Sequence, residues 1–161
     1  MPLDAPFRLG PFVVDTAGRL EPGEPGRFPS FHLVWRGCQV HARLDGDDAA
    51  GGTLVLRAII ARVPSTAGGD AARNQERRTE ALGALRGLGR AAEPSLPLRL
   101  LPDHRVAVEA ARPVALPASA VDLLTQIACF LLDLAPYLDV LAEAGVPVDA
   151  APPSTEGMVK T

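Results

Sequence analysis

Hydrophobic and polar residues alternate most regularly between Phe31 and Leu44, which predicts two strands of an antiparallel sheet. If Arg36 and Gly37 form a two-residue turn, the apolar residues of both strands share one face. The same register places His32 directly opposite His41 on the polar face. We therefore expect a half-buried β-hairpin in this part of the chain.

Strand signals on both sides extend this hairpin. Residues 7–20 are rich in β-forming residues and end in an Asp-x-x-Gly turn signal, so they predict an earlier hairpin. Residues 53–63 predict a third strand that is apolar on both faces. In a regular strand the side chains of Arg57 and Arg62 would lie on opposite faces, which indicates a bulge between them.

A helix and a strand pair follow the three strands. Asp70 is a good N-cap for a helix that runs to about Leu88, and the apolar stripe of this helix is concentrated in its C-terminal half. Residues 98–101 and 105–111 then predict two strands joined by a tight turn. The sheet thus gains two further strands.

The strongest helix signal runs from Ser119 to Ala144. The helix opens with a capping box in which Asp122 takes the usual place of Glu, and Gly145 ends it. Pro136 cannot donate a hydrogen bond to the preceding turn, so it predicts a kink near residues 132–134. The main apolar stripe consists of Val121, Leu124, Ile127, Ala128, Leu131, Leu134, Leu138 and Leu141.

Leu123, Phe130 and Tyr137 widen this stripe well beyond a narrow face. One sheet is too small to cover so wide an apolar helix, so we expect these three residues to contribute to an interaction surface. A reciprocal helix contact in a homodimer would cover that surface.

Together these elements predict an α+β fold. An antiparallel sheet of about five or more strands, built from a β-meander, a helix and a β-hairpin, is covered by the long, kinked C-terminal helix. A chain of 161 residues fits one domain, which we place at residues 1–145. The polar, proline-rich residues 146–161 predict a disordered C-terminal tail.

Composition and charge indicate which classes of partner and which cellular compartment to expect. Hydrophobic residues make up 47% of the chain and the net charge is -3, so no basic footprint for nucleic acid is present. Charged residues within the last helix argue against a membrane span, and the N-terminus shows no secretory signal, so we expect a cytoplasmic protein. Cys38 and Cys129 lack the spacing of metal ligands and are expected to be buried free thiols.

Three places carry residue types that ligand binding or catalysis could use. His32 and His41 could share a metal ion, yet the sequence places no third ligand nearby, so solvated strand histidines are the preferred interpretation. Asp103-His104 has the residue types of an acid–base pair, although adjacent turn residues more often form an Asx-type backbone bond. Residues 63–69 resemble a small anion-binding loop without the P-loop lysine, and a capped connector is the simpler explanation.

A cluster of arginines on the first helix could bind an acidic partner. Glu76 and Glu80 lie among these arginines at helical spacing, which favours a solvated helix face. The members of the cluster are Arg73, Arg77 and Arg78.

No pattern in the chain predicts a catalytic residue, a cofactor or a metal.

The order of elements, with three strands, a helix, a strand pair and a long closing helix, resembles the type III secretion chaperone-like fold, which the YbjN family of bacterial proteins also adopts. The resemblance covers about residues 31–145 and rests on element order, without a diagnostic motif. The chain departs from the family at its start, where the family has a helix and this sequence is β-rich and interrupted by proline. The resemblance implies a homodimer that binds another polypeptide or acts in regulation, and it assigns no site residues.

We therefore expect a bacterial, non-enzymatic protein-interaction module of a chaperone-like or regulatory kind. The alternative is a carrier of a small lipophilic ligand, held in an apolar pocket between the sheet and the C-terminal helix. A third possibility is an enzyme, which would rest on Asp103-His104 and the Ser65-Thr66 loop.

Overall fold

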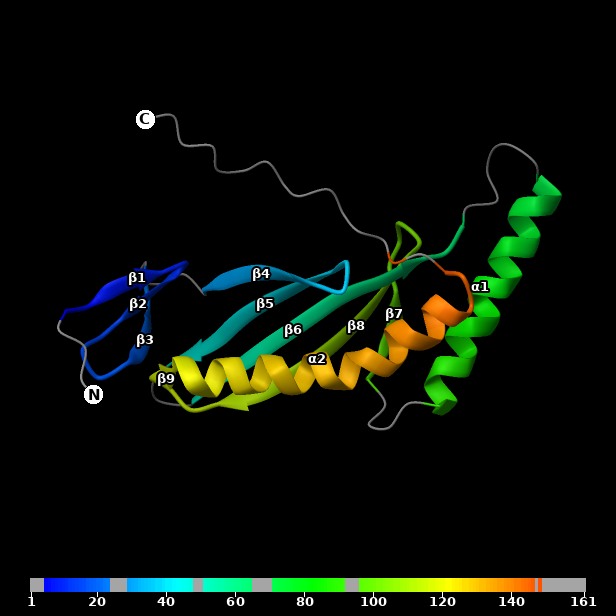
Figure 1. Ribbon diagram of the computed structural model, residues 1–161. Coiled ribbons are helices and arrows are strands. Elements are labelled where there is room, and N and C mark those ends of the chain that lie inside the picture. Colours follow the sequence, from blue (N-terminus) through cyan, green and yellow to red (C-terminus); the bar gives the residue numbers. More distant parts are fainter. Residues whose placement is uncertain are drawn as a thin grey trace, which may run out of the picture.

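The computed structural model describes residues 5–23, 29–47, 51–64, 71–91, 96–146 and 148. Two antiparallel sheets and two helices make up this part of the chain (Figure 1). The elements in chain order are β1 (Phe7–Leu9), β2 (Phe12–Val14), β3 (Arg19–Pro22), β4 (Ser30–Trp35), β5 (Cys38–Asp47), β6 (Gly51–Arg62), α1 (Ala71–Ala91), β7 (Leu98–Leu100), β8 (Arg105–Val114), β9 (Ala118–Ser119) and α2 (Ala120–Glu143). The predicted α+β class and the order of the main elements are confirmed.

The larger sheet has five strands in the order β4-β5-β6-β8-β7. Trp35 pairs with Cys38 across a two-residue turn, and His32 pairs with His41, as the alternation predicts. Both turn residues have positive φ angles, 50° at Arg36 and 77° at Gly37, which suit the right-handed twist of the flanking strands. The hairpin that the sequence predicts between residues 31 and 44 is therefore confirmed in register.

β6, the strand expected at residues 53–63, contains the predicted bulge. The register between β6 and β8 shifts between Ile59 and Ala61, and this shift lies between Arg57 and Arg62. Beyond the shift, Arg62 pairs with Arg105, whereas before it Arg57 pairs with Glu109 and forms an ion pair with it at 2.7 Å. The bulge therefore changes which alternate residues face the core. The buried residues up to the shift are Leu54, Leu56, Ala58 and Ile60, and those that follow are Ala61 and Val63.

The N-terminal strands belong to a second, smaller sheet. This sheet has the order β1-β2-β3-β9, and among the described strands β9 alone pairs it with the C-terminal half of the chain. Asp15 shapes the β2–β3 turn, because its side chain accepts hydrogen bonds from the backbone N–H groups of Ala17 and Arg19, both at 2.8 Å. The predicted Asp-x-x-Gly turn is confirmed.

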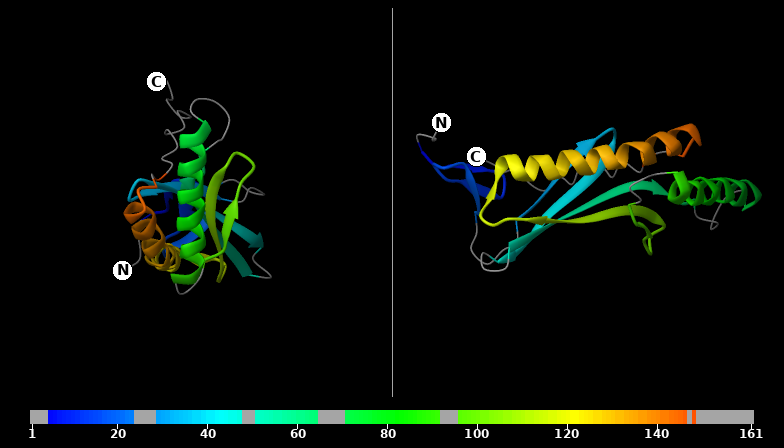
Figure 2. Two further views of the ribbon diagram at one scale, coloured as in Figure 1. Left: turned by 90° about the vertical axis from the view of Figure 1, so that its right-hand side faces the viewer. Right: turned by 90° about the horizontal axis from the view of Figure 1, so that it is seen from below.

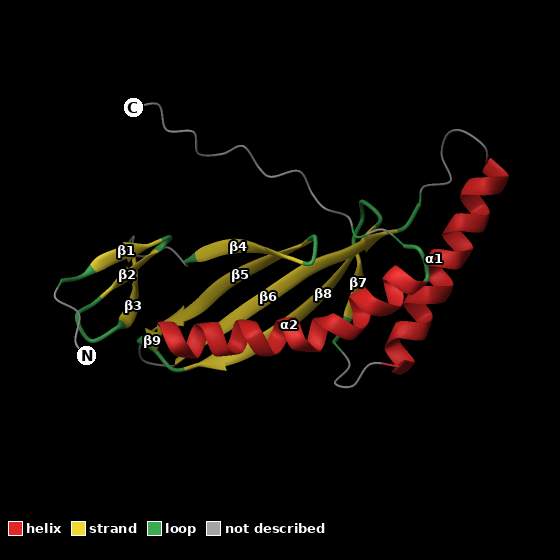
Figure 3. Cartoon of the chain, in the orientation of Figure 1, coloured by secondary structure: helices red, strands yellow, loops and turns green. Residues whose placement is uncertain are grey.

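α2 runs along one face of the five-stranded sheet, from the small sheet at one end to α1 at the other (Figures 2 and 3). The Ser119 hydroxyl accepts a hydrogen bond from the backbone N–H of Asp122 and donates one to its carboxylate, so the predicted cap is confirmed. At the other end Gly145 has a φ of 66°, and the N–H of Val146 bonds the carbonyl of Leu141. This is the glycine-based helix ending that the sequence predicts. The predicted kink near residues 132–134 stays a prediction.

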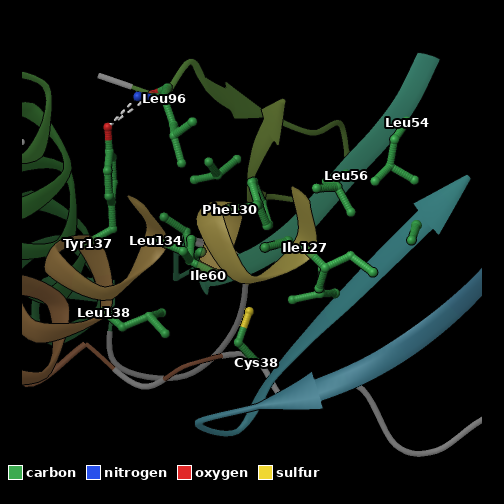
Figure 4. Packing of buried hydrophobic residues seen from close by; sticks show 14 of the residues in the cluster. Cys38, Leu54, Leu56, Ile60, Leu96, Ile127, Phe130, Leu134, Tyr137 and Leu138 are labelled. Carbon is green, nitrogen blue, oxygen red and sulfur yellow. Dashed lines mark hydrogen bonds between the residues drawn. The ribbon is translucent and has the colours of Figure 1, made fainter. Parts of the chain in front are cut away.

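The core lies between α2 and the five-stranded sheet (Figure 4). Phe130, Leu134 and Tyr137 of α2 have no solvent exposure, and Tyr137 points toward Leu96 (Figure 4). The Tyr137 hydroxyl accepts a hydrogen bond of 2.6 Å from the backbone N–H of Leu96 and donates one of 3.3 Å to the carbonyl of the same residue. The largest buried polar side chain of the helix is therefore fully satisfied.

The predicted domain boundary at residue 145 and the predicted disordered tail stay predictions, since residues 147 and 149–161 lie outside the described residues. Val146 is 8% exposed, and Val148 packs against the core.

The expected burial of both thiols is confirmed for one of them. Cys38 is buried as expected, whereas Cys129 is exposed on α2. The Cys38 thiol donates to the carbonyl of Ile59, and burial raises its pKa to about 11.

Candidate functional site

The interaction surface predicted from Leu123, Phe130 and Tyr137 is wrong in its position. These residues are 3%, 0% and 0% exposed, because they lie on the side of α2 that faces the sheet. The two aromatic side chains are the largest on the helix, and their burial removes more apolar area from water than burial of the aliphatic residues would. The helix is therefore rotated so that part of the predicted main stripe faces outward instead.

The outward side of α2 carries exposed apolar residues. Val121, Leu124 and Leu132 are 71%, 64% and 71% exposed, and Ala128 between them is exposed as well. The spacing of these four residues, at three or four positions, places them along one side of the helix. We call Val121, Leu124, Ala128 and Leu132 the α2 strip.

An apolar groove lies beside the N-terminal end of this strip. It has a volume of about 270 Å³ and lies between the β1–β2 turn, β3, β4 and the first half of α2. Its lining residues carry no charged or hydrogen-bonding side chain, and they are Leu9, Gly10, Pro11, Phe12, Leu20, Phe31, Ala120, Leu123, Leu124 and Ile127.

Two aromatic rings join the two sheets at the groove. Phe12 of the small sheet and Phe31 of β4 meet edge to face, with ring centroids 6.0 Å apart. Leu9 and Leu124 line the groove from different elements and are 50% and 64% exposed, so the groove opens to solvent between them. A ligand there would contact apolar carbon almost exclusively.

The opposed histidines lie on the solvent-facing side of the five-stranded sheet, away from the groove. His41 has Arg57 as its cross-strand neighbour on β6, and Arg43 lies two residues along β5. Partial burial, followed by the charges of His32, Arg57 and Arg43, lowers the pKa of His41. Among the described residues no group of three or more His, Cys, Asp or Glu side chains is placed to hold a metal ion.

Asp103 and His104 do not form an acid–base pair. The Asp103 carboxylate accepts hydrogen bonds from the backbone N–H of Arg105 at 3.2 Å and from its guanidinium at 2.6 Å. Slight desolvation, which raises the pKa of Asp103, is outweighed by these two hydrogen bonds and by the charge of Arg105, so the pKa lies below its usual value. His104 has a φ of 65° and uses its backbone carbonyl to accept from Val63. The Asx-type interpretation is confirmed.

The possible anion-binding loop and the arginine cluster of α1 add little to the candidate site. Of the possible anion-binding loop, residues 65–69 lie outside the described residues, and so does the Asp70 cap. On α1, the Arg78 guanidinium donates a hydrogen bond of 3.1 Å to the carbonyl of Pro64, so it ties the helix to the end of β6. Arg73 and Arg77 are exposed.

By length and hydropathy, α2 is also the one described helix that could cross a membrane, a test that core helices pass as well. Its seven buried side chains face the protein core, and Asp133 is ion-paired with Arg112 of β8. The expectation that it is not a membrane span stays a prediction.

Sequence reasoning missed the groove, although it anticipated an apolar pocket against the C-terminal helix. The groove depends on the small sheet, whose attachment to β9 joins residues about a hundred positions apart. A local signal was nevertheless present: Leu9 and Phe12 flank Gly10-Pro11 in a segment with no polar residue from Leu9 to Val14.

Comparisons with protein-family models, with curated proteins and with solved structures find no match to this chain.

Proposed function

We propose that this protein is a non-enzymatic interaction module that binds an apolar segment of another polypeptide in the groove between the small sheet and α2. The observation that supports the proposal is the distribution of exposed apolar side chains. Of the seven large apolar side chains that are exposed among the described residues, five lie on β1 or on the outward side of α2: Phe7, Leu9, Val121, Leu124 and Leu132. Exposed apolar side chains that gather on a few elements are typical of a protein–protein contact.

The shape of the groove favours a polypeptide over a free small molecule. Pockets that enclose drug-sized ligands have volumes of about 300–1,000 Å³ and bury most of the ligand. The groove has a volume of about 270 Å³ and opens between Leu9 and Leu124, so it suits one or two apolar side chains presented from outside. The exposed residues around it would then contact the rest of the segment.

The chaperone-like resemblance agrees with this proposal, since it implies a protein that binds another polypeptide. The Asp103 carboxylate bonds Arg105 rather than His104, which favours the non-enzymatic proposal.

The test is the selection of binding peptides from a random library displayed on phage, followed by fluorescence anisotropy with the selected peptides. We expect peptides with aliphatic or aromatic anchors, and we expect Leu9→Glu to weaken their binding at least about tenfold, because it places a charge in the groove. Val34→Glu is the matched control, since Val34 is 72% exposed on β4 and does not line the groove. Equal binding by the wild type and both variants would contradict the proposal.

A carrier of a small lipophilic ligand is the second candidate, favoured by the wholly apolar lining. Native mass spectrometry of the freshly purified protein separates the two. A retained small molecule that Leu9→Glu releases would support the carrier, whereas a ligand-free protein that binds the selected peptides would support the interaction module.

A further inference from the structure

We infer that the α2 strip is a self-association surface, on which α2 of a second copy packs antiparallel. The inference goes beyond the proposed function, because the strip shares only Leu124 with the groove. Three observations carry it: the symmetry of the strip, the charge distribution along α2 and the small size of its central residue.

The strip is symmetric about Ala128. Leu124 and Leu132 lie four residues before and four residues after it, on the same side of the helix. A twofold axis at Ala128 therefore places Leu124 of one copy beside Leu132 of the other, and the reverse, which is a self-complementary contact. The alanine methyl at the centre lets the two helix axes approach closely.

The charges of α2 favour the antiparallel direction. The helix contains no basic residue, and its C-terminal part carries Asp139 and Glu143 at the negative end of the helix dipole. Asp139 is ion-paired with Arg36 of the same copy at 2.6 Å, and Ser119 and Asp122 already cap the N-terminus of α2. A parallel partner would bring the acidic C-terminal ends of the two helices together, whereas an antiparallel partner keeps them apart and places each beside the positive end of the other helix dipole.

The same charges disfavour a membrane surface as the occupant. Helices that bind anionic lipid head groups carry lysine or arginine on the polar side. The charged residues of α2 are all acidic: Asp122, Asp133, Asp139 and Glu143. A second copy offers an apolar strip of matching length without a patch of negative lipid charge.

The strip alone is small for an interface, since stable complexes bury about 800 Å² on each partner. We therefore expect a dimer that depends on concentration. Sedimentation velocity on the full chain, from micromolar to hundreds of micromolar, should show a shift from monomer to dimer. Leu132→Glu should remove this shift, and Val34→Glu, a change at an equally exposed apolar residue, should keep it.

Cross-linking tests the direction of packing. In a Cys129→Ala background, we expect an equimolar mixture of Val121→Cys and Ala135→Cys proteins to form mixed disulfides, since these positions are seven residues on either side of Ala128. Val121→Cys alone should not cross-link. Cys38 does not interfere, because it is buried.

Three results would overturn the inference. These are a wild type that stays monomeric at every concentration, a Leu132→Glu variant that still dimerises, and binding to anionic phosphatidylserine vesicles that Leu132→Glu abolishes. Cross-linking of Val121→Cys with itself would overturn the antiparallel direction. The groove proposal is tested separately, since Leu132 does not line the groove and Leu9 is not part of the strip, although Leu124 belongs to both surfaces.

Discussion

Tyr137 shows how one side chain sets the orientation of α2. Its hydroxyl is the only hydrogen-bonding group that the helix brings fully into the described core, and both of its bonds are to the backbone of Leu96. A buried hydroxyl without partners is costly, so the helix orientation that supplies them is favoured. The outward position of Val121 and Leu132 follows from this choice.

Replacing Tyr137 with Phe should destabilise the fold by about 1–3 kcal/mol, because the N–H and carbonyl of Leu96 lose their buried partner. Urea unfolding followed by circular dichroism measures the change. Thr79→Val is the control, since the Thr79 hydroxyl bonds the Gln75 carbonyl on the exposed side of α1 and should cost little. An equal loss in the two variants would contradict the role given to Tyr137.

His41 makes stability depend on pH. Its folded-state pKa is lowered, first by partial burial and then by the charges of His32, Arg57 and Arg43, so the unfolded chain binds the proton more readily than the folded chain. As the pH falls through the unfolded value of about 6.5, the free energy of unfolding should fall and then level off below the folded pKa.

Urea midpoints of the wild type and His41→Gln between pH 8 and 5 test this dependence. The variant should show a smaller loss on acidification and little difference from the wild type at pH 8. A wild-type midpoint that rises on acidification would contradict the assignment.

At the scale of elements, two glycines differ in whether their positions require glycine. Gly46 of β5 has a φ of 128°, and an added Cβ would lie 2.5 Å from the Gly51 carbonyl oxygen. Gly83 of α1 has nothing within 4 Å and a negative φ. The first position needs glycine, and the second does not.

Gly46→Ala should therefore cost about 1–3 kcal/mol through backbone strain and the clash with Gly51. Gly83→Ala should stabilise the protein by about 0.8–1 kcal/mol, because alanine has the higher helix propensity. Thermal unfolding of both variants compares them directly, and the same sign in both would contradict this account.

Elements with local signals could be predicted from the sequence, and elements with distant partners could not. The β4–β5 hairpin follows from the alternation around Arg36-Gly37, and the ends of α2 follow from Ser119 and Gly145. β9 is only two residues long and overlaps the helix cap, so nothing local separates it from the start of α2. The division of the strands into two sheets could therefore not be predicted from the sequence.

The side of α2 that faces the sheet could be predicted only in part, because it also depends on distant contacts. Its apolar residues cover most of the circumference, so periodicity alone does not decide which side faces the sheet. The decision depends on Phe130, Tyr137 and the position of Leu96, which are tertiary contacts.

At the scale of the whole molecule, the two proposed surfaces share Leu124. This residue lines the groove and also belongs to the α2 strip. A second copy packed on the strip would bring its own Leu132 to the rim of the groove. If both proposals hold, the oligomeric state and the affinity for a polypeptide segment are coupled through this side chain.

β9 gives the small sheet its only strand pairing with the rest of the described chain, through Arg19 with Ser119 and Leu20 with Ala118. Few hydrogen bonds therefore oppose local opening of this sheet. The groove exists only while the small sheet is docked, so any occupant binds the docked state alone and draws the population toward it. The measured affinity then contains the free energy of docking the first strands of the chain. Substitutions at Leu20 or Ala118 would change this affinity through the docked fraction, with the contacts of the occupant to α2 left as they are.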